Sequence, residues 1–244
     1  MKESMEKEYF IQGWDISNKE IPSECDYCYQ YQKISKQIDC LLELFPEIGN
    51  NTEIINNQNL YLPLEAEEWF VIPKWQNLAP TYLEAVKKVI DKIKKIQGDS
   101  FKNYLEKDLE NSSFFHQSPE SLESLQALNQ SNCDFLIIAA QFGRRHRGRS
   151  PGKVLEIINI YNNNSKFKEI PLGLYSVGIM LLTHFDRLKF RDDLLWIDCI
   201  GDWIINENHL LYPCIINNGG KIRINARTNH FSYDYGAVTG FIIA

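Results

Sequence analysis

Arginine is concentrated in one short segment of the chain. All eight arginines lie after residue 143, although lysine supplies most of the positive charge elsewhere. Arginine differs from lysine in its planar guanidinium group, which binds a carboxylate or a phosphate through two parallel hydrogen bonds and also stacks on aromatic rings. The clustering therefore indicates a candidate anion-binding site. Its members are Arg144, Arg145, Arg147 and Arg149, together with His146 and Ser150.

The elements predicted on either side of this segment favour anion binding. An apolar run over 135–140, followed by Gly143, is typical of a buried central strand. Ser150 and Pro151 are a typical helix start and predict a helix over 151–161. The first N–H groups of a helix and the positive end of its dipole attract anions. We therefore expect the arginine segment and the N–H groups after Ser150 to bind a phosphate-bearing ligand, either a nucleotide or nucleic acid.

The arginine segment has two other interpretations. Its guanidinium groups can meet an acidic patch on another protein, which would make the chain a protein-interaction module. They can also lie solvated at the surface or pair with carboxylates of the same chain. The acidic candidates for such pairs are Glu156, Asp186, Asp192 and Asp193.

The run from Gly143 to Ser150 also has the glycine spacing of a phosphate-binding P-loop. Arg149 stands where that motif has lysine. In addition, only 94 residues follow Ser150, which leaves little chain for the parallel sheet that the motif requires. We therefore do not assign a P-loop.

A second group of reactive side chains lies between residues 184 and 202. Asp198 ends a run that predicts a buried strand, so we expect it to be the first catalytic carboxylate, with Asp202 as the second. In this alternative the protein is a hydrolase or transferase in which His146 or His184 acts with an aspartate, while the arginines hold an anionic substrate. The structural alternative is an acidic turn that caps or solvates the connection. The whole group is His184, Asp186, Asp192, Asp193, Asp198 and Asp202.

Six cysteines are spread along the chain, and Cys25 and Cys28 are the closest pair. Their spacing is that of a zinc knuckle, and Cys40 is a third candidate ligand, but no fourth ligand follows a zinc pattern. We therefore assign no metal site and name no cofactor. Cys199 and His184 have the residue types of a nucleophile and its base, although the apolar run around Cys199 favours core packing.

Composition and charge define the broad class of protein. The chain has 244 residues, of which 44% are apolar, so it has enough material for a substantial core. A net charge of −6 argues against a generally basic surface, so an anion site must be local. The charged N-terminal residues lack the apolar run of a secretory signal, and no segment has the roughly 18 apolar residues that span a bilayer. We expect a soluble, cytoplasmic protein that does not bind membranes, and the sequence leaves its oligomeric state open.

Helices are predicted mainly in the middle of the chain. Thr81 and Glu84 have the spacing of a capping box, and Gly98 is a typical helix end. Ser118 and Pro119 have the pattern of another helix start. The predicted helices lie near 30–44, from 81 to 98, over 101–110, from 118 onward, over 151–161 and over 172–183, the last being apolar nearly all round and therefore buried.

Strands are predicted mainly in the C-terminal part of the chain, over 194–199, 210–216, 221–226 and 237–243, with a hairpin turn at 217–220. Helices that precede strands indicate an α+β fold, with amphipathic helices packed on a mixed or antiparallel sheet. We predict an irregular N-terminal layer over 1–78 and an α+β core domain over 79–244, with one continuous domain over 1–244 as the alternative.

Overall fold

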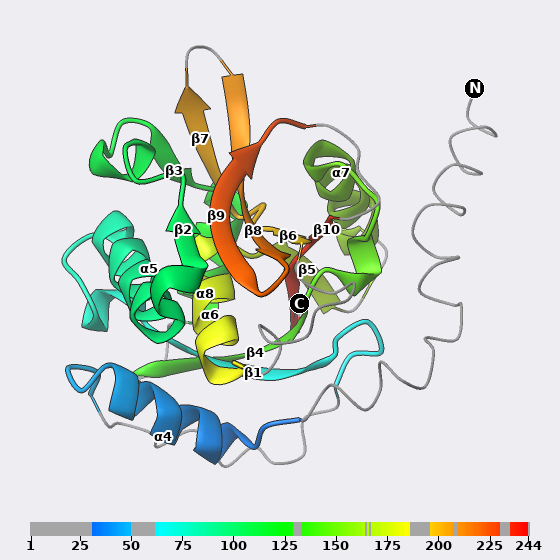
Figure 1. Ribbon diagram of the computed structural model, residues 1–244. Helices are drawn as coiled ribbons and strands as arrows, with labels where there is room; N and C mark the ends of the chain where they lie inside the picture. Colours follow the sequence, from blue (N-terminus) through cyan, green and yellow to red (C-terminus); the bar gives the residue numbers. More distant parts are fainter. Residues whose placement is uncertain are drawn as a thin grey trace.

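The computed structural model describes residues 31–49, 62–128, 133–163, 165, 167–185, 196–206, 209–229 and 235–243. These residues form helices packed on mixed and antiparallel sheets, with most strands in the C-terminal part (Figure 1). The predicted α+β class is therefore confirmed. No helix in this part of the chain is long and apolar enough to cross a bilayer.

The first sheet has four antiparallel strands in the order β1-β4-β11-β5. The strand β4, at Phe135–Gln141, pairs with β1 on one side and β11 on the other, which confirms the predicted central strand. Its apolar run reflects this position, because six of its seven residues are buried. The other strands are β1 at Glu68–Pro73, β11 at Thr239–Ile243 and β5 at Phe167–Pro171.

The second sheet follows the order β10-β6-β8-β7-β3, and β9 pairs with both β8 and β2. Its neighbours are antiparallel except for the parallel pairs β10 with β6 and β2 with β9. Gly219 and Gly220 join β8 to β9 with φ of 62° and 80°, the left-handed backbone of a two-residue hairpin turn, as predicted. The strands are β2 at Phe101–Asn103, β3 at Phe115–Gln117, β6 at Trp196–Asp198, β7 at Asp202–Asn206, β8 at His209–Asn218, β9 at Lys221–Arg227 and β10 at Gly236–Ala237.

The helices α5, α6 and α7 begin at the caps that the sequence predicts. Thr81 and Glu84 form a reciprocal capping box at the start of α5, and Gly98 ends that helix. Ser118 Oγ accepts the N–H of Ser121 at the start of α6. The helices are α4 at Ile34–Leu44, α5 at Tyr82–Gln97, α6 at Pro119–Leu128, α7 at Pro151–Asn162 and α8 at Leu174–Thr183, and the short 3-10 helices are η2 at Trp75–Asn77, η3 at Gly98–Ser100, η4 at Asp108–Glu110 and η5 at Arg144–His146.

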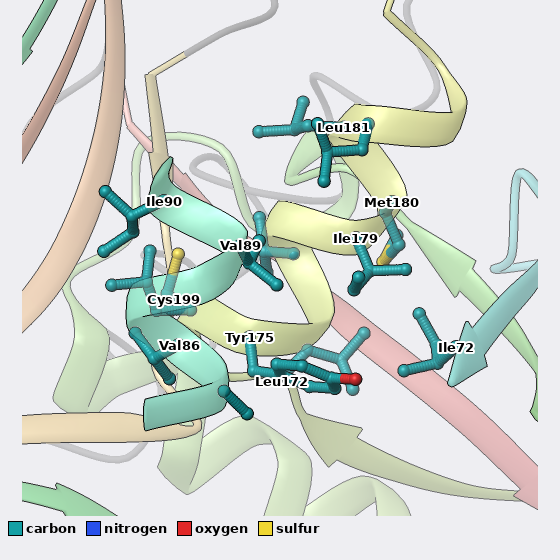
Figure 2. Packing of buried hydrophobic residues seen from close by; sticks show 14 of the residues in the cluster. Ile72, Val86, Val89, Ile90, Leu172, Tyr175, Ile179, Met180, Leu181 and Cys199 are labelled. Carbon is teal, nitrogen blue, oxygen red and sulfur yellow. The ribbon is translucent and has the colours of Figure 1, made fainter. Parts of the chain in front are cut away.

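The helix α8 lies at the centre of the core. Every residue of α8 is buried, as its continuous apolar sequence predicts, and the helix contacts α5, α4 and β1. Figure 2 shows Val89 of α5 directed toward α8. Gly178 permits this close approach, because a Cβ atom at that position would lie 2.5 Å from Cγ1 of Val89. The helix α8, which follows β5 along the chain, is therefore packed tightly against α5.

Two predicted elements differ in the structure. The predicted helix over 101–110 is wrong, because this segment forms β2 and η4. Asn103 Oδ1 accepts the N–H of Leu105 and turns the chain, while β2 pairs with the distant β9. The predicted strand over 237–243 is two strands, because Val238 donates its N–H to the carbonyl of Asp198 and the chain passes there from one sheet to the other.

The structure also contains strands that the sequence did not predict, namely β1, β3, β5 and β7. Among them, β1 comes from the predicted N-terminal layer and pairs with β4 over all six of its residues. The separate domain boundaries stay a prediction. Of the strand predicted over 194–199, the described part gives β6, and residues 194 and 195 lie outside it.

Candidate functional site

The arginine loop, defined as residues 143–150, connects β4 to α7. Gly143 and Gly148 have φ of 88° and 78°, a backbone that glycine adopts most readily. The N–H of Gly148 donates to the carbonyl of Tyr235 at 2.7 Å. Gly143 and Gly236 meet backbone to backbone, with no room for a Cβ atom on either residue. The loop is therefore fixed against the segment that leads into β10.

His146, within this loop, is fully buried. Its Nε2 atom is 2.6 Å from Oε1 of Glu169, and its Nδ1 atom is 3.0 Å from Nη1 of Arg149. A guanidinium can only donate, so Nδ1 accepts and the proton resides on Nε2, which donates to Glu169. Burial lowers the pKa of His146 and so favours the same neutral form, although Glu169 opposes that effect. Both ring nitrogens are therefore engaged within the chain.

Glu169, on β5, is the carboxylate that holds the loop in place. It accepts from Arg145 Nε at 3.3 Å and from the Thr239 hydroxyl at 2.7 Å, in addition to His146. Burial alone would raise its pKa, but His146 and Arg145 lower it to about 2. Gln141 completes the network by donating to the Thr239 hydroxyl. The loop is thus anchored to three strands of the first sheet.

Pairing of the arginines with carboxylates of the same chain was one of the alternatives. The main carboxylate partner is Glu169, which was not among the four acidic candidates. Glu156 binds Lys153 at 3.2 Å, and Asp186, Asp192 and Asp193 lie outside the described residues. Glu169 follows Lys168 in an ordinary mixed strand sequence, which carries no local signal of its burial. Only the pairing of β5 with β11 places Glu169 near the loop.

The predicted N–H groups at the start of α7 are already satisfied. Pro151 has no N–H group, and Gly152 donates to Oδ1 of Asn229 at 2.6 Å. Lys153 donates to the Ser150 hydroxyl, and Val154 donates to the Ser150 carbonyl. An anion could use the Gly152 N–H only by displacing the Asn229 side chain. The expectation of free donors after Ser150 is therefore corrected.

Arg144, Arg145 and Arg147 are half-buried. Arg149 is buried and donates to the Arg145 carbonyl as well as to His146. The Nη2 atom of Arg144 is buried and has no hydrogen-bond partner among the described residues. Arg144 is therefore a loop side chain whose donor capacity the described part of the chain does not fully use.

Asp198 pairs with an arginine rather than with a histidine. Arg227 donates to it twice, from Nε at 2.7 Å and from Nη2 at 2.5 Å. Burial raises the pKa of Asp198, and the two hydrogen bonds from Arg227 oppose that rise. The Arg227 guanidinium lies over the Tyr235 ring, 4.2 Å from its centroid. Both oxygens of Asp198 are therefore used in a buried bidentate pair.

Asp202 caps the central helix α8. It accepts the N–H of Leu174 at 2.6 Å and the hydroxyl of Tyr82 at 3.0 and 3.1 Å. Gly173, the residue before the helix, leaves the space that this carboxyl fills. Burial raises the pKa of Asp202 to about 7 despite these hydrogen bonds. The carboxyl thus supplies the cap that a glycine cannot provide.

His184 lies in a different buried pair. Its Nε2 atom is 3.2 Å from Oε2 of Glu68, and its Nδ1 atom is 2.9 Å from the Thr183 hydroxyl. The rings of Phe70 and Phe142 meet it edge to face. The structure therefore joins each histidine to a glutamate and brings neither His146 nor His184 into contact with Asp198 or Asp202.

The described residues do not place Cys40 in a metal-binding group. Cys199 is fully buried, and burial raises the pKa of its thiol well above the usual value, so it is not a ready nucleophile. Cys40 Sγ lies 3.8 Å from the Leu182 carbonyl. Within the described ranges, no three histidine, cysteine or acidic side chains form a metal-binding group. Cys25 and Cys28 lie outside these ranges.

Comparison of the chain with protein-family models, with curated proteins and with solved structures gives no match. The function is therefore argued from the geometry of the arginine loop and its surroundings.

Proposed function

We propose that the chain binds a phosphate-bearing ligand, a nucleotide or nucleic acid, at the arginine loop, with Arg144 as the principal contact. The observation that carries this proposal is the buried Nη2 atom of Arg144, which has no hydrogen-bond partner among the described residues. Buried polar groups in proteins are normally hydrogen-bonded, and a guanidinium donor matches a phosphate oxygen. A bound phosphate would satisfy this donor.

The other loop residues have supporting roles in this proposal. Arg145, His146 and Arg149 are positioning residues, because their contacts with Glu169 and with one another fix the loop. A fixed loop loses little conformational entropy when a ligand binds. Arg147 adds a second positive charge beside Arg144. Because His146 is neutral, Arg145 is the residue that balances the negative charge of Glu169. The charges of the other loop arginines then make the local electrostatic potential positive.

The experiment is a thermal-shift titration with pyrophosphate and ATP at two salt concentrations. We expect both ligands to stabilise the wild type, since a ligand that binds only the folded state raises its stability by mass action. Arg144→Ala should weaken binding by about tenfold or more, and Arg144→Lys should restore part of the loss because it returns the charge without the fork. Lys95→Ala, an exposed change on α5, is the control for a lost positive charge.

Equal affinity of wild type and Arg144→Ala at both salt concentrations would refute the proposal. The observed contacts favour binding over the hydrolase or transferase alternative, because the histidines and aspartates of that alternative lie in four separate contacts. The two histidines face Glu169 and Glu68, whereas the aspartates face Arg227 and Tyr82.

A further inference from the structure

One face of the second sheet carries several positive side chains and the ring of Trp196. Directly paired residues of neighbouring strands project from the same face, and so do residues two positions apart. Trp196, Ile216 and Arg223 are paired across β6, β8 and β9, and Lys102 of β2 lies opposite Arg223. We call this surface the β9 face, and it comprises Lys102, Trp196, Lys221, Arg223, Asn225 and Arg227.

The opposite face of the same strands belongs to the core. Ile197, Ile215, Ile222 and Ile224 point there and are buried. On the β9 face, by contrast, Lys102, Lys221 and Asn225 are exposed, and the others are half-buried. The strand β9 therefore alternates between apolar residues inside and polar residues outside, and three of its four outward residues are cations.

Among the described residues, the positive charge at the outer end of the β9 face is not balanced by a paired carboxylate. Asp198 is the one carboxylate at the paired positions of β6, β8 and β9, and it is buried beneath Arg227. Arg223 Nε is buried and has no hydrogen-bond partner among the described residues. This local excess contrasts with the net charge of −6 for the whole chain. The surface thus suits a polyanion with regularly spaced charges.

The aromatic side chains of this region are held in fixed positions. The Trp196 indole N–H donates to the Asn217 carbonyl at 3.0 Å. The rings of Trp196 and Tyr235 meet at an interplanar angle of 66°, with their centroids 5.2 Å apart. Arg227 covers the Tyr235 ring. Trp196, which is half-buried, is therefore a rigid and partly open surface on which a planar base can stack.

The β9 face continues into the arginine loop. Tyr235 contacts Trp196 and Arg227 with its ring and accepts the N–H of Gly148 with its carbonyl. The next residue, Gly236, packs against the backbone of Gly143. Figure 1 shows β10 next to β6, at the edge of the second sheet on the side of α7. Phosphate groups bound at the two regions can therefore belong to one continuous strand.

We propose that the β9 face binds single-stranded nucleic acid, with a base stacked on Trp196 and successive phosphates held by Arg223, Lys221 and Lys102. This inference rests on the proposed function, because the arginine loop holds one end of the same strand. Stacking requires bases that are not already enclosed in a duplex, and alternating cations beside an aromatic ring on an open sheet meet that requirement. Binding is therefore sequence-tolerant and strongly dependent on salt.

The test uses fluorescence anisotropy with a labelled 12-nucleotide oligothymidylate and thermal shift with ATP. We expect the wild type to bind the oligonucleotide more tightly than ATP. Lys221→Glu and Arg223→Ala should each weaken oligonucleotide binding by about threefold to tenfold and reduce its salt slope by roughly 0.7. Both variants should leave ATP binding unchanged, whereas Arg144→Ala should weaken both ligands. Lys95→Glu matches the charge reversal at a remote exposed site and should change neither.

Trp196→Leu tests the stacking and should weaken oligonucleotide binding by about fivefold or more. Its folding is checked by circular dichroism, and Lys221→Glu, at an exposed strand end, keeps the test decisive if Trp196→Leu fails to fold. ATP binding that depends on Arg144, with oligonucleotide binding that ignores both β9 changes, would overturn this inference and leave the arginine loop standing. Binding of neither ligand would overturn both proposals. Equal binding of a 12-base-pair duplex, with the same sensitivity to both variants, would overturn the single-strand assignment.

Discussion

Replacing Asp202 by asparagine tests how the first turn of α8 is held. The buried carboxyl accepts hydrogen bonds from Leu174 N–H and the Tyr82 hydroxyl, and burial raises its pKa to about 7. Asparagine keeps an oxygen for Leu174 and a polar group for Tyr82, so it resembles the protonated carboxyl in size and hydrogen bonding. It differs in that it cannot ionise. The variant therefore isolates the cost of a buried negative charge.

The magnitude follows from the difference between the folded and unfolded pKa values. The folded state binds this proton more tightly than an unfolded aspartate, whose pKa is about 3.9. A raised acid pKa gives stability that is fully present below the unfolded pKa and is lost as pH rises through the folded pKa. With a folded pKa of about 7, the wild type loses roughly 2–3 kcal/mol from Asp202 between pH 5 and pH 8.

The assay is urea unfolding of wild type and Asp202→Asn at pH 5, 6, 7 and 8, with circular dichroism as the measured signal. We expect the variant to be about 1–2 kcal/mol more stable than the wild type at pH 5, where an unfolded aspartate is already ionised, and to gain roughly a further 2–3 kcal/mol on the wild type by pH 8. The comparison removes the contribution of His146, whose lowered pKa acts with the opposite sign. A difference that stays constant across this range would refute the argument, because Asp202 would then not titrate there.

Three further substitutions test the packing and the polar contacts. Glu169→Gln should lower the free energy of unfolding by roughly 3–5 kcal/mol, since it leaves Arg145 without its buried carboxylate. Because the pKa of Glu169 is lowered to about 2, its stabilisation is present above pH 4.5 and is lost as pH falls toward 2, so acid unfolding of this variant should show a smaller pH slope. Gly178→Ala should cost about 1–3 kcal/mol in urea unfolding by forcing Val89 away, and an unchanged stability would contradict the close helix contact. Asn229→Ala should cost about 1 kcal/mol through the lost cap on α7, seen as a lower Tm, whereas an unchanged Tm would contradict the cap.

Local patterns in the sequence predicted those elements whose ends are set by neighbouring residues. The capping box at Thr81 and the cap at Ser150 involve contacts within three residues, so the helix starts could be read directly. The segment 101–110 misled because buried Phe101, Leu105 and Leu109 repeat every four residues, as in a helix. Pairing of β2 with β9 determines its structure, and that partner is about 120 residues away along the chain.

The candidate site shows the same division. The arginine cluster and the burial around Asp198 were visible from residue types and runs of apolar residues. The partners that determine what these groups do were not, because Glu169 and Arg227 reach His146 and Asp198 through the register of two sheets. Charge clusters therefore located the region, whereas the hydrogen bonds that leave Arg144 unsatisfied required the folded chain.

The passage of the chain through Val238 also has a consequence for the folding pathway. The strand β11 lies between β4 and β5, so these two strands become part of one sheet only when residues 239–243 enter between them. Such long-range pairing is entropically costly and tends to be slow. The same segment brings Thr239 to Glu169 and Tyr235 to Gly148. Closure of the first sheet and fixing of the arginine loop therefore depend on the same C-terminal segment, so the loop is held in its folded position only when that segment has paired.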